Sequence, residues 1–176
     1  LGKATDEEGM SGELLKTLKG RGREELRRMF NRILGGGEIP RSWRRSRVVL
    51  LHKGGEKSRI KHYRPVAISS VFYKLMMLIV RGRIEGWIER GGILNETQGG
   101  FRQGRRTDDN LFMIGRLIEM AKGRKQSMLV ACLDLEKAYD RVNREKLFEV
   151  IERMGMCGRV VRLLREVYKD NEVRFV

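Results

Sequence analysis

Apolar residues recur at helical spacing along most of this chain. One helical face ends at the glycines of 35–37 and carries Leu26, Met29, Phe30, Ile33 and Leu34. A serine or threonine precedes three other periodic segments, where its side-chain oxygen can cap the first turn. The pattern predicts six helices: 12–18 after Ser11, one ending at Leu34, one from Ser69 or Ser70 to Gly91, one from Thr107 to Gly123, 143–154, and 158–169.

Shorter apolar runs predict strands instead. Residues 48–51 form one, and Pro65 opens a second extended segment after the polar loop 52–64, so we expect a hairpin with a basic tip. Residues 128–133 are an uninterrupted apolar run, too short for a helix, which favours a strand covered on both faces. Residues 172–176 alternate as a last strand would.

The mixture of helices and strands predicts an α+β architecture. The chain starts at Leu1 rather than at methionine and stops within the alternating segment 172–176. We therefore expect an internal piece of a longer protein, whose last strand has no following partner with which to complete a sheet.

The charge balance of the chain indicates the kind of partner that it binds. Lys and Arg number 38 against 23 Asp and Glu among 176 residues, a formal net charge of +15, which favours nucleic acid as partner. An anionic membrane is the alternative. The least charged stretch, 65–80, contains Lys74 and falls short of the ~20 apolar residues that cross a bilayer, so we expect no membrane association.

Several enzyme classes are excluded by what the sequence lacks. Cys132, Cys157, His52 and His62 are too few and too scattered for a structural zinc site. The sequence has no Ser-His-Asp signature and no Gly-x-x-x-x-Gly-Lys-Ser loop. Because no secretory pattern opens the chain, the two cysteines favour a reduced, intracellular setting.

The positive charge is concentrated in residues 41–64, which hold nine basic residues and one acidic residue. A surface that needs only solubility would mix the two signs, so we assign this segment to nucleic-acid or nucleotide contact, with Lys57, Arg59 and Lys61 at its tip.

A second loop, 98–106, combines glycines, arginines and one aromatic residue. Glycines let the backbone approach a phosphate chain and arginines fork onto phosphate oxygens, which makes Phe101, Arg102 and Arg105 candidates for nucleic-acid contact. The alternative is a flexible solvent loop with a packed Phe101.

Asp134 directly follows the apolar run 128–133, where the predicted strand leaves the core. A carboxylate at a strand end is well placed to hold Mg²⁺, which prefers oxygen ligands. Asp134 can equally cap the following turn by accepting backbone N–H bonds, and this segment alone does not decide between the two.

Four blocks of the sequence resemble, in the expected order, the reverse transcriptases of LINE-type (non-LTR) retrotransposons, with group II intron enzymes as more distant relatives. Residues 62–69 (His-Tyr-Arg-Pro-Val-Ala-Ile-Ser) are similar to the Tyr-Arg-Pro-Ile-Ser signature, and 98–105 to the Gln-x-Gly-Phe-Arg-x-Gly-Arg block. Residues 39–53 resemble the first fingers block, and 133–140 the palm block that bears the first catalytic aspartate. The four blocks cover nearly the whole chain.

The resemblance implies addition of deoxynucleoside triphosphates to a DNA primer on an RNA template, with two Mg²⁺ ions. It implies Asp134 and the backbone carbonyl of Leu135 as metal ligands, and Lys53 and Arg64 as triphosphate contacts. Tyr139 would be a steric gate that leaves no room for a ribose 2′-hydroxyl; the alternative is a core tyrosine. Asp140 would make a structural bond.

The resemblance also implies a right-hand polymerase fold, with a helical lead-in over 1–46, fingers over 47–126 and the first part of the palm over 127–176. The family's Tyr-x-Asp-Asp hairpin is absent from the sequence. One carboxylate of three holds Mg²⁺ poorly, so we predict that these 176 residues alone do not polymerise. A nucleic-acid-binding module without chemistry and a decayed mobile-element relic are the alternatives. Nuclear action is implied by the resemblance alone, and the sequence assigns no oligomeric state.

Overall fold

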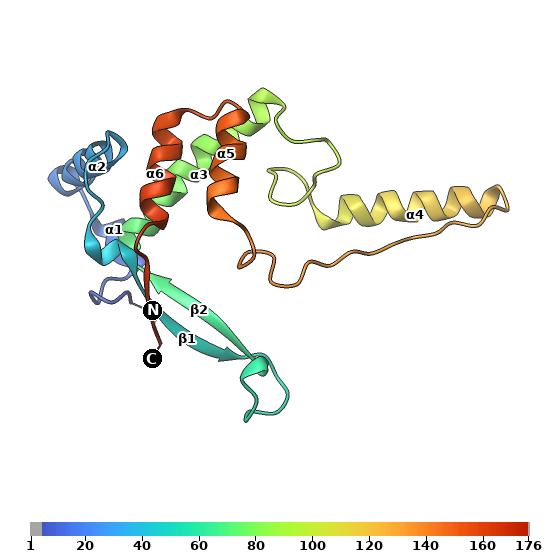
Figure 1. Cartoon of the computed structure of the whole chain (residues 1–176), viewed down its shortest axis with the longest axis horizontal. Coiled ribbons are helices and arrows are strands. Elements are labelled where there is room, and N and C mark those ends of the chain that lie inside the picture. Colours follow the sequence, from blue (N-terminus) through green and yellow to red (C-terminus); the bar gives the residue numbers. More distant parts are fainter. Residues whose placement is uncertain (1–4, 176) are drawn as a thin grey trace. The chain divides into compact units, whose positions relative to one another are not determined.

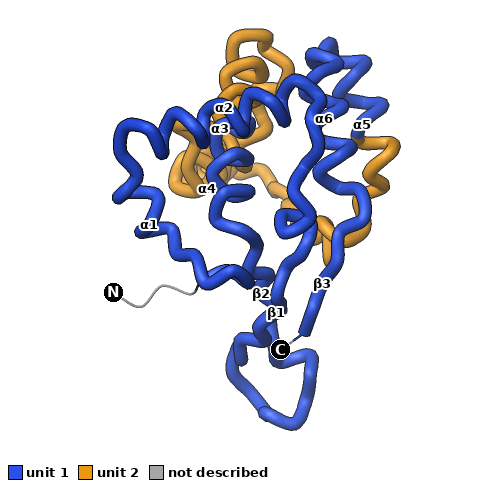
Figure 2. Tube along the Cα trace, turned by 90° about the vertical axis from the view of Figure 1, so that its left-hand side faces the viewer, with its two compact units in different colours: residues 1–81, 148–176 blue, residues 82–147 orange. Residues whose placement is uncertain are grey.

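In the computed structural model, which describes residues 5–175, the chain divides into two compact units (Figure 2). Residues up to Arg81 and residues from Phe148 onward form the first unit, and Gly82–Leu147 forms the second. Two short 3₁₀ turns, Arg41–Arg44 and Ile60–His62, accompany the main elements. These elements are α1 Gly12–Thr17, α2 Gly20–Leu34, β1 Arg45–His52, β2 Tyr63–Ser69, α3 Val71–Gly91, α4 Thr107–Gly123, α5 Arg144–Arg153, α6 Gly158–Tyr168 and β3 Glu172–Phe175 (Figure 1).

The strands of the first unit form a three-stranded sheet in the order β2-β1-β3. β1 and β2 are antiparallel, with Val48 opposite Ala67, which confirms the predicted hairpin. β3 pairs with β1 in parallel and places Phe175 beside Val48. No strand follows β3 in the sequence, as expected, but β3 finds its partner in the earlier strand β1; Val176 is outside the described residues.

Arg44 explains how β3 reaches β1. Its guanidinium donates to the carbonyl oxygen of Lys169 at 2.8 Å and lies 3.6 Å from carboxylate oxygens of both Glu166 and Asp170. These contacts fix the turn that follows α6, so the chain leaves it at the edge of β1. A salt bridge of 3.3 Å from Arg45 to Glu172 continues the attachment at the first residue pair of the two strands.

The core of the first unit forms where α2, α3 and α6 supply buried side chains. Trp43 contacts both Phe30 and Tyr73 in edge-to-face geometry, with ring centroids 6.1 and 6.3 Å apart. Burying one such large side chain stabilises the fold by about 1.5–3 kcal/mol. The remaining buried apolar residues are Ile33, Ile39, Val48, Val71, Met76, Val80, Phe148, Val161, Leu163 and Val167.

The N-terminus of α3 is capped from a distant part of the chain. The buried Asp6 carboxylate accepts a hydrogen bond from the backbone N–H of Val71 at 2.9 Å, and its other oxygen accepts from the N–H of Met10 at 2.8 Å. The prediction of Ser69 or Ser70 as the cap was wrong. The Ser69 hydroxyl instead bonds that of Ser46 at 2.9 Å, and the Ser70 hydroxyl is buried without a partner among the described residues. The negative carboxylate suits the positive end of the helix dipole better than a serine does.

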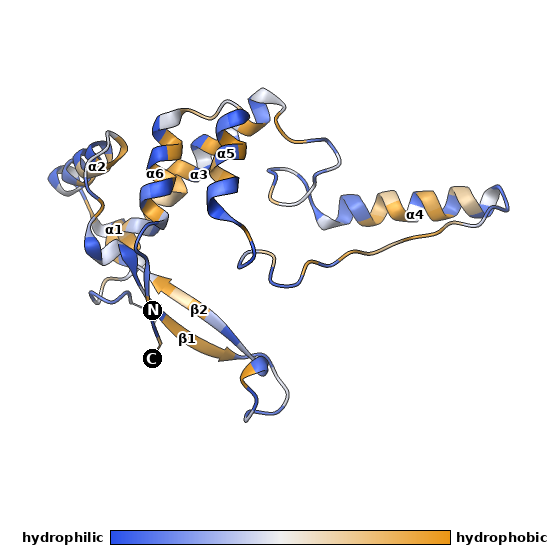
Figure 3. Ribbon diagram, in the orientation of Figure 1, coloured by the Kyte–Doolittle hydropathy of each residue, from blue (hydrophilic) through white to orange (hydrophobic). Residues whose placement is uncertain are grey.

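The second unit holds α4 and an irregular segment that follows it (Figure 1). The predicted strand over 128–133 is absent: this segment is extended but unpaired, and Leu129 and Leu133 are 99% and 94% exposed. An apolar run becomes a strand only when neighbours take up its backbone N–H and C=O groups, and no strand of the described residues lies beside this one. Figure 3 shows apolar residues along α4, where Phe112 and Leu111 are also exposed.

The other helices lie close to their predicted positions, and the mixture of helices with a small sheet is compatible with the α+β class. The two units cut across the predicted subdomains, because residues from Phe148 onward group with the hairpin rather than with 127–147. The names fingers and palm for 47–126 and 127–176, and lead-in for 1–46, stay a prediction. No helix in the described part of the chain is both long and apolar enough to cross a bilayer.

Candidate nucleotide and nucleic-acid site

The tip of the β1-β2 hairpin is held in shape by its own backbone. The Lys53 N–H donates to the His62 carbonyl oxygen at 2.7 Å, and the Tyr63 hydroxyl donates to the Lys57 carbonyl oxygen at 3.1 Å. His62 Nδ1 is hydrogen-bonded to the Glu56 carbonyl oxygen at 2.8 Å. Gly55 adopts φ +89° beneath this ring, a left-handed conformation that favours glycine. These hydrogen bonds therefore hold the tip in a defined conformation, which fixes the arrangement of its side chains.

The basic side chains of this tip differ in how free they are. Arg59 forms a salt bridge of 2.6 Å with Glu56, whereas Lys57 and Lys61 are exposed and make no ion pair within the described residues. Of the three predicted contacts, the two lysines thus have uncommitted charges that a phosphate can meet.

Lys53 and Arg64 lie on the same face of the hairpin. Arg64 is the direct partner of Leu51 across the two strands, and Lys53 lies two residues beyond Leu51. Side chains two residues apart in a strand share a face, and the bond from Lys53 to the His62 carbonyl continues the pairing to this point. Both side chains are exposed, so the structure brings these two predicted triphosphate contacts together.

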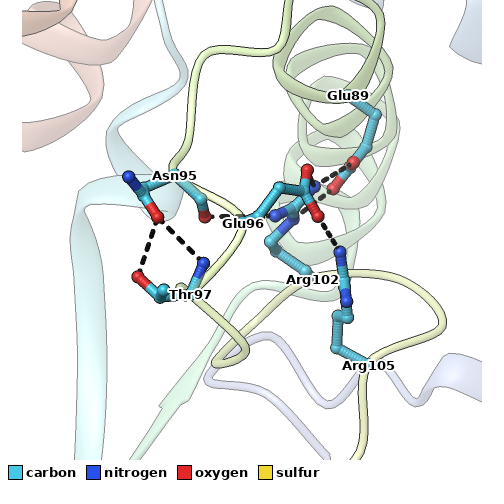
Figure 4. Close-up of polar contacts among 6 residues, drawn as sticks. All are labelled: Glu89, Asn95, Glu96, Thr97, Arg102 and Arg105. Atoms are coloured by element: carbon cyan, nitrogen blue, oxygen red, sulfur yellow. Dashed lines mark hydrogen bonds and ion pairs between the residues drawn. The ribbon is translucent and has the colours of Figure 1, made fainter.

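The Arg102 guanidinium is paired with carboxylates of the protein and is not free in solvent (Figure 4). Its Nε and Nη2 donate to the two carboxylate oxygens of Glu89 at 3.0 and 2.8 Å, and its Nη1 donates to the Asn95 carbonyl oxygen at 3.3 Å. Only 9% of the side chain is exposed. Arg102 holds the pKa of the Glu89 carboxyl below its usual value, mainly through these hydrogen bonds, and Glu89 raises the pKa of Arg102. This forked pair ties the loop to the end of α3.

Arg105 is engaged in the same way, through an ion pair with Glu96 (Figure 4). Both arginines that the sequence assigned to phosphate contact are thus paired with carboxylates. Sequence reasoning missed Glu89 and Glu96 as partners, since Glu89 lies 13 residues before Arg102 and follows no periodic rule. The only available signal was their negative charge near a basic loop.

Phe101 and Tyr139 meet within the second unit. Their ring centroids are 6.4 Å apart and the planes cross at 81°, an edge-to-face contact. Phe101 is 87% and Tyr139 79% exposed, so neither is the packed core residue that the alternatives proposed. Phe101 also has φ +61°, which is uncommon for a residue with a side chain.

Asp134 lies in the irregular segment, exposed, and its carboxylate makes no hydrogen bond or ion pair with other described residues. Leu135 beside it is exposed as well. A turn follows, in which the Asp140 N–H donates to the Lys137 carbonyl oxygen at 3.0 Å. The Asp140 side chain has no partner in the described part of the chain, contrary to the structural bond expected for it. The capping role considered for Asp134 is likewise absent.

The predicted site residues are divided between the units. Lys53, Arg64 and the tip lysines belong to the first, and Asp134, Tyr139 and the 98–106 loop belong to the second. Residues 5–175 contain no cluster of three or more His, Cys, Asp or Glu side chains that could hold a metal ion. Asp134 therefore offers an uncommitted oxygen ligand by itself.

Comparison with known proteins gives the family. A model of the family "Reverse transcriptase (RNA-dependent DNA polymerase)" matches residues 51–175. The chain is 29% identical over 84% of its length to "Transposon TX1 uncharacterized 149 kDa protein" of Xenopus laevis. It is 27% identical over 80% to "Probable RNA-directed DNA polymerase from transposon BS" of Drosophila melanogaster, and 26% identical over 68% to the "Retrovirus-related Pol polyprotein from type-1 retrotransposable element R2" of Popillia japonica.

The matches cover 11% of the TX1 protein and 16% of the other two. The match of the family model runs from the first strand of the hairpin to β3, through every candidate residue described above. The chain belongs to the reverse transcriptase (RNA-dependent DNA polymerase) family.

Proposed function

We propose that this chain contributes the incoming-nucleotide side of an RNA-directed DNA polymerase from a LINE-type retrotransposon. The partners are an RNA template, a DNA primer and deoxynucleoside triphosphates. The family match over 51–175 carries this proposal. The hairpin supports it, because it places Lys53 and Arg64 on one exposed face, where two cations can meet a triphosphate. We also infer nuclear action, from the resemblance to such elements alone.

Reverse transcriptases in general use divalent metal ions, and we propose Mg²⁺ here. The donor set fits in kind, since the free Asp134 carboxylate and the neighbouring Leu135 carbonyl are the oxygen ligands that Mg²⁺ prefers. When bound, two such ions supply charge stabilisation of the attacking and leaving oxygens. Asp134 would hold them at the end of the segment that sequence analysis assigned to a strand.

In this proposal the remaining residues bind the triphosphate and the template and select the sugar. Lys53 and Arg64 neutralise the triphosphate, whose negative charge shifts toward the leaving group during transfer. Lys57 and Lys61 contact the backbone of the template with their uncommitted charges. Tyr139 lies beneath the sugar and excludes a 2′-hydroxyl.

The test uses the complete open reading frame that contains these residues. Asp134→Asn removes a metal ligand while leaving the shape of the side chain, so primer extension should fall at least about 100-fold. Binding of the RNA template should stay within about twofold, since it depends on the basic tip. Asp108→Asn is the matched control, because Asp108 is an exposed carboxylate of the same unit in the first turn of α4, and it should leave extension unchanged.

Retained extension in Asp134→Asn would remove Asp134 from the catalytic machinery. Loss of template binding together with extension would instead indicate a disrupted fold. If the complete wild-type frame binds RNA but extends no primer, the chain acts as a binding module or derives from a decayed element. We expect the 176 residues alone to bind RNA without extending a primer.

A further inference from the structure

We propose that Phe101 is a positioning residue for sugar selection: its ring backs the Tyr139 ring and keeps the steric gate in place. This inference rests on the proposed function, because it needs Tyr139 to be the gate. It differs from the nucleic-acid contact that the sequence predicted for Phe101.

The contact itself is the first observation. The rings of Phe101 and Tyr139 come from loops 38 residues apart and meet edge to face, at 6.4 Å and 81°. Both are largely exposed, so the contact does not follow from general burial in a core. An exposed tyrosine without a neighbour would change rotamer freely, whereas an edge-to-face partner favours one orientation.

The backbone of Phe101 is the second observation. A φ of +61° places this residue in the left-handed region, which residues with a Cβ rarely adopt. The loop therefore holds this residue in an unfavourable backbone conformation, which sets the direction of its side chain. Glycine occupies the two positions before Phe101 but not position 101 itself. A loop that needed only a tight turn would be better served by glycine at 101.

The third observation is that hydrogen bonds hold the next residue, Arg102, in place. Arg102 donates two hydrogen bonds to Glu89 and one to the Asn95 carbonyl, which fixes the loop against the end of α3 (Figure 4). Because Arg102 is engaged in this way, Phe101 projects from an anchored backbone. A ring on a fixed backbone can resist displacement of its neighbour, whereas a ring on a mobile loop would move with it.

A steric gate selects deoxynucleotides only if its ring is not displaced by the 2′-hydroxyl of a ribonucleotide. A ribonucleotide differs from its deoxy counterpart by one hydroxyl, so it enters whenever the Tyr139 ring yields by roughly the width of that group. If Phe101 opposes this movement, its loss weakens rejection of ribonucleotides. Addition of deoxynucleotides should change little, because no contact to the deoxy substrate is removed.

The experiment measures incorporation of dCTP and CTP in single-turnover primer extension by the complete reading frame. Phe101→Ala and Phe101→Leu keep a Cβ at φ +61° and remove only the ring, and Phe101→Tyr retains it. We expect both ring-less variants to lower the dCTP/CTP preference by about three- to tenfold, the range of one aromatic contact, while the rate with dCTP stays within about twofold. Phe101→Tyr should keep the wild-type preference.

Two further variants make the result decisive. Tyr139→Ala should lower the preference more than Phe101→Ala, and the double variant should equal Tyr139→Ala, since a support without a gate has no effect. Phe112→Ala is the matched control: Phe112 is an exposed phenylalanine of the same unit, and no aromatic ring of the described residues contacts it. It should leave the preference unchanged.

The outcomes separate this inference from the proposed function. If Tyr139→Ala loses selection and Phe101→Ala retains it, Phe101 does not support the gate. If Phe101→Ala weakens RNA binding without changing the dCTP/CTP preference, Phe101 is a nucleic-acid contact and the inference is overturned. If Tyr139→Ala leaves selection unchanged while the wild-type protein polymerises, the assignment of the gate fails and this inference fails with it. Absence of polymerisation by the wild-type protein would overturn the proposed function, and with it the inference.

Discussion

At the scale of single residues, the contacts that organise this molecule join positions far apart in sequence. Asp6 caps α3 across 65 residues, and Arg102 binds Glu89 across 13. Sequence reasoning identified Arg102 by its charge but assigned it to phosphate, because local patterns show that an arginine is present and not which carboxylate lies beside it. Cap prediction failed for the same reason, since it searches the residues next to the helix and Asp6 is elsewhere.

Asp6 offers a direct measure of such a long-range contact. Its buried carboxylate accepts hydrogen bonds from three backbone N–H groups, those of Val71, Met10 and Glu8. Asp6→Ala leaves these donors unpaired, so the free energy of unfolding in urea should fall by about 1–3 kcal/mol. Glu8→Gln is the control, because the Glu8 side chain is exposed, and it should stay within about 0.5 kcal/mol. Equal effects of the two substitutions would show that the cap contributes nothing.

At the scale of elements, the sequence predicted what short-range periodicity determines. The helices and the hairpin were located because each carries its own apolar spacing and its own breaks. The strand predicted over 128–133 did not form. Its apolar run indicates a preference for burial, but no strand of the described residues pairs with it. The pairing of β3 with β1 also escaped prediction, since it joins segments more than 120 positions apart, as do the salt bridges of Arg44 and Arg45 that accompany it.

The hairpin tip provides a test at this scale, through two adjacent glycines. Gly54 and Gly55 both have positive φ, but a Cβ on Gly54 meets nothing within 4 Å, whereas one on Gly55 would lie 2.9 Å from the His62 ring. Gly54→Ala should therefore cost about 1–2 kcal/mol of backbone strain alone. Gly55→Ala should cost more and also break the bond from His62 to Glu56, which gives weaker RNA binding in a filter assay. Identical binding by the two variants would contradict a tip shaped by that ring.

Across the whole molecule, the basic residues behind the net charge of +15 are not all equally available to a polyanion. Many arginines are neutralised locally: Arg44 and Arg45 attach β3, and Arg102 and Arg105 hold the 98–106 loop. The cations left for a polyanion are therefore fewer than composition suggests, and those at the hairpin tip lie next to the proposed triphosphate contacts.

This difference predicts unequal effects on the salt dependence of RNA binding. The slope of log K against log salt concentration changes by about 0.7 for each contact to single-stranded phosphate. Lys57→Ala and Lys61→Ala should each reduce the slope by about that amount, because their charges are uncommitted. Arg59→Ala should reduce it less, since the Arg59 charge is already paired with Glu56 at 2.6 Å and so neutralises less phosphate. Lys16→Ala on α1 is an exposed control in the same unit and should leave the slope unchanged. A slope unaffected by either tip lysine would place the RNA on another surface, because an electrostatic contact cannot be lost without releasing fewer counterions.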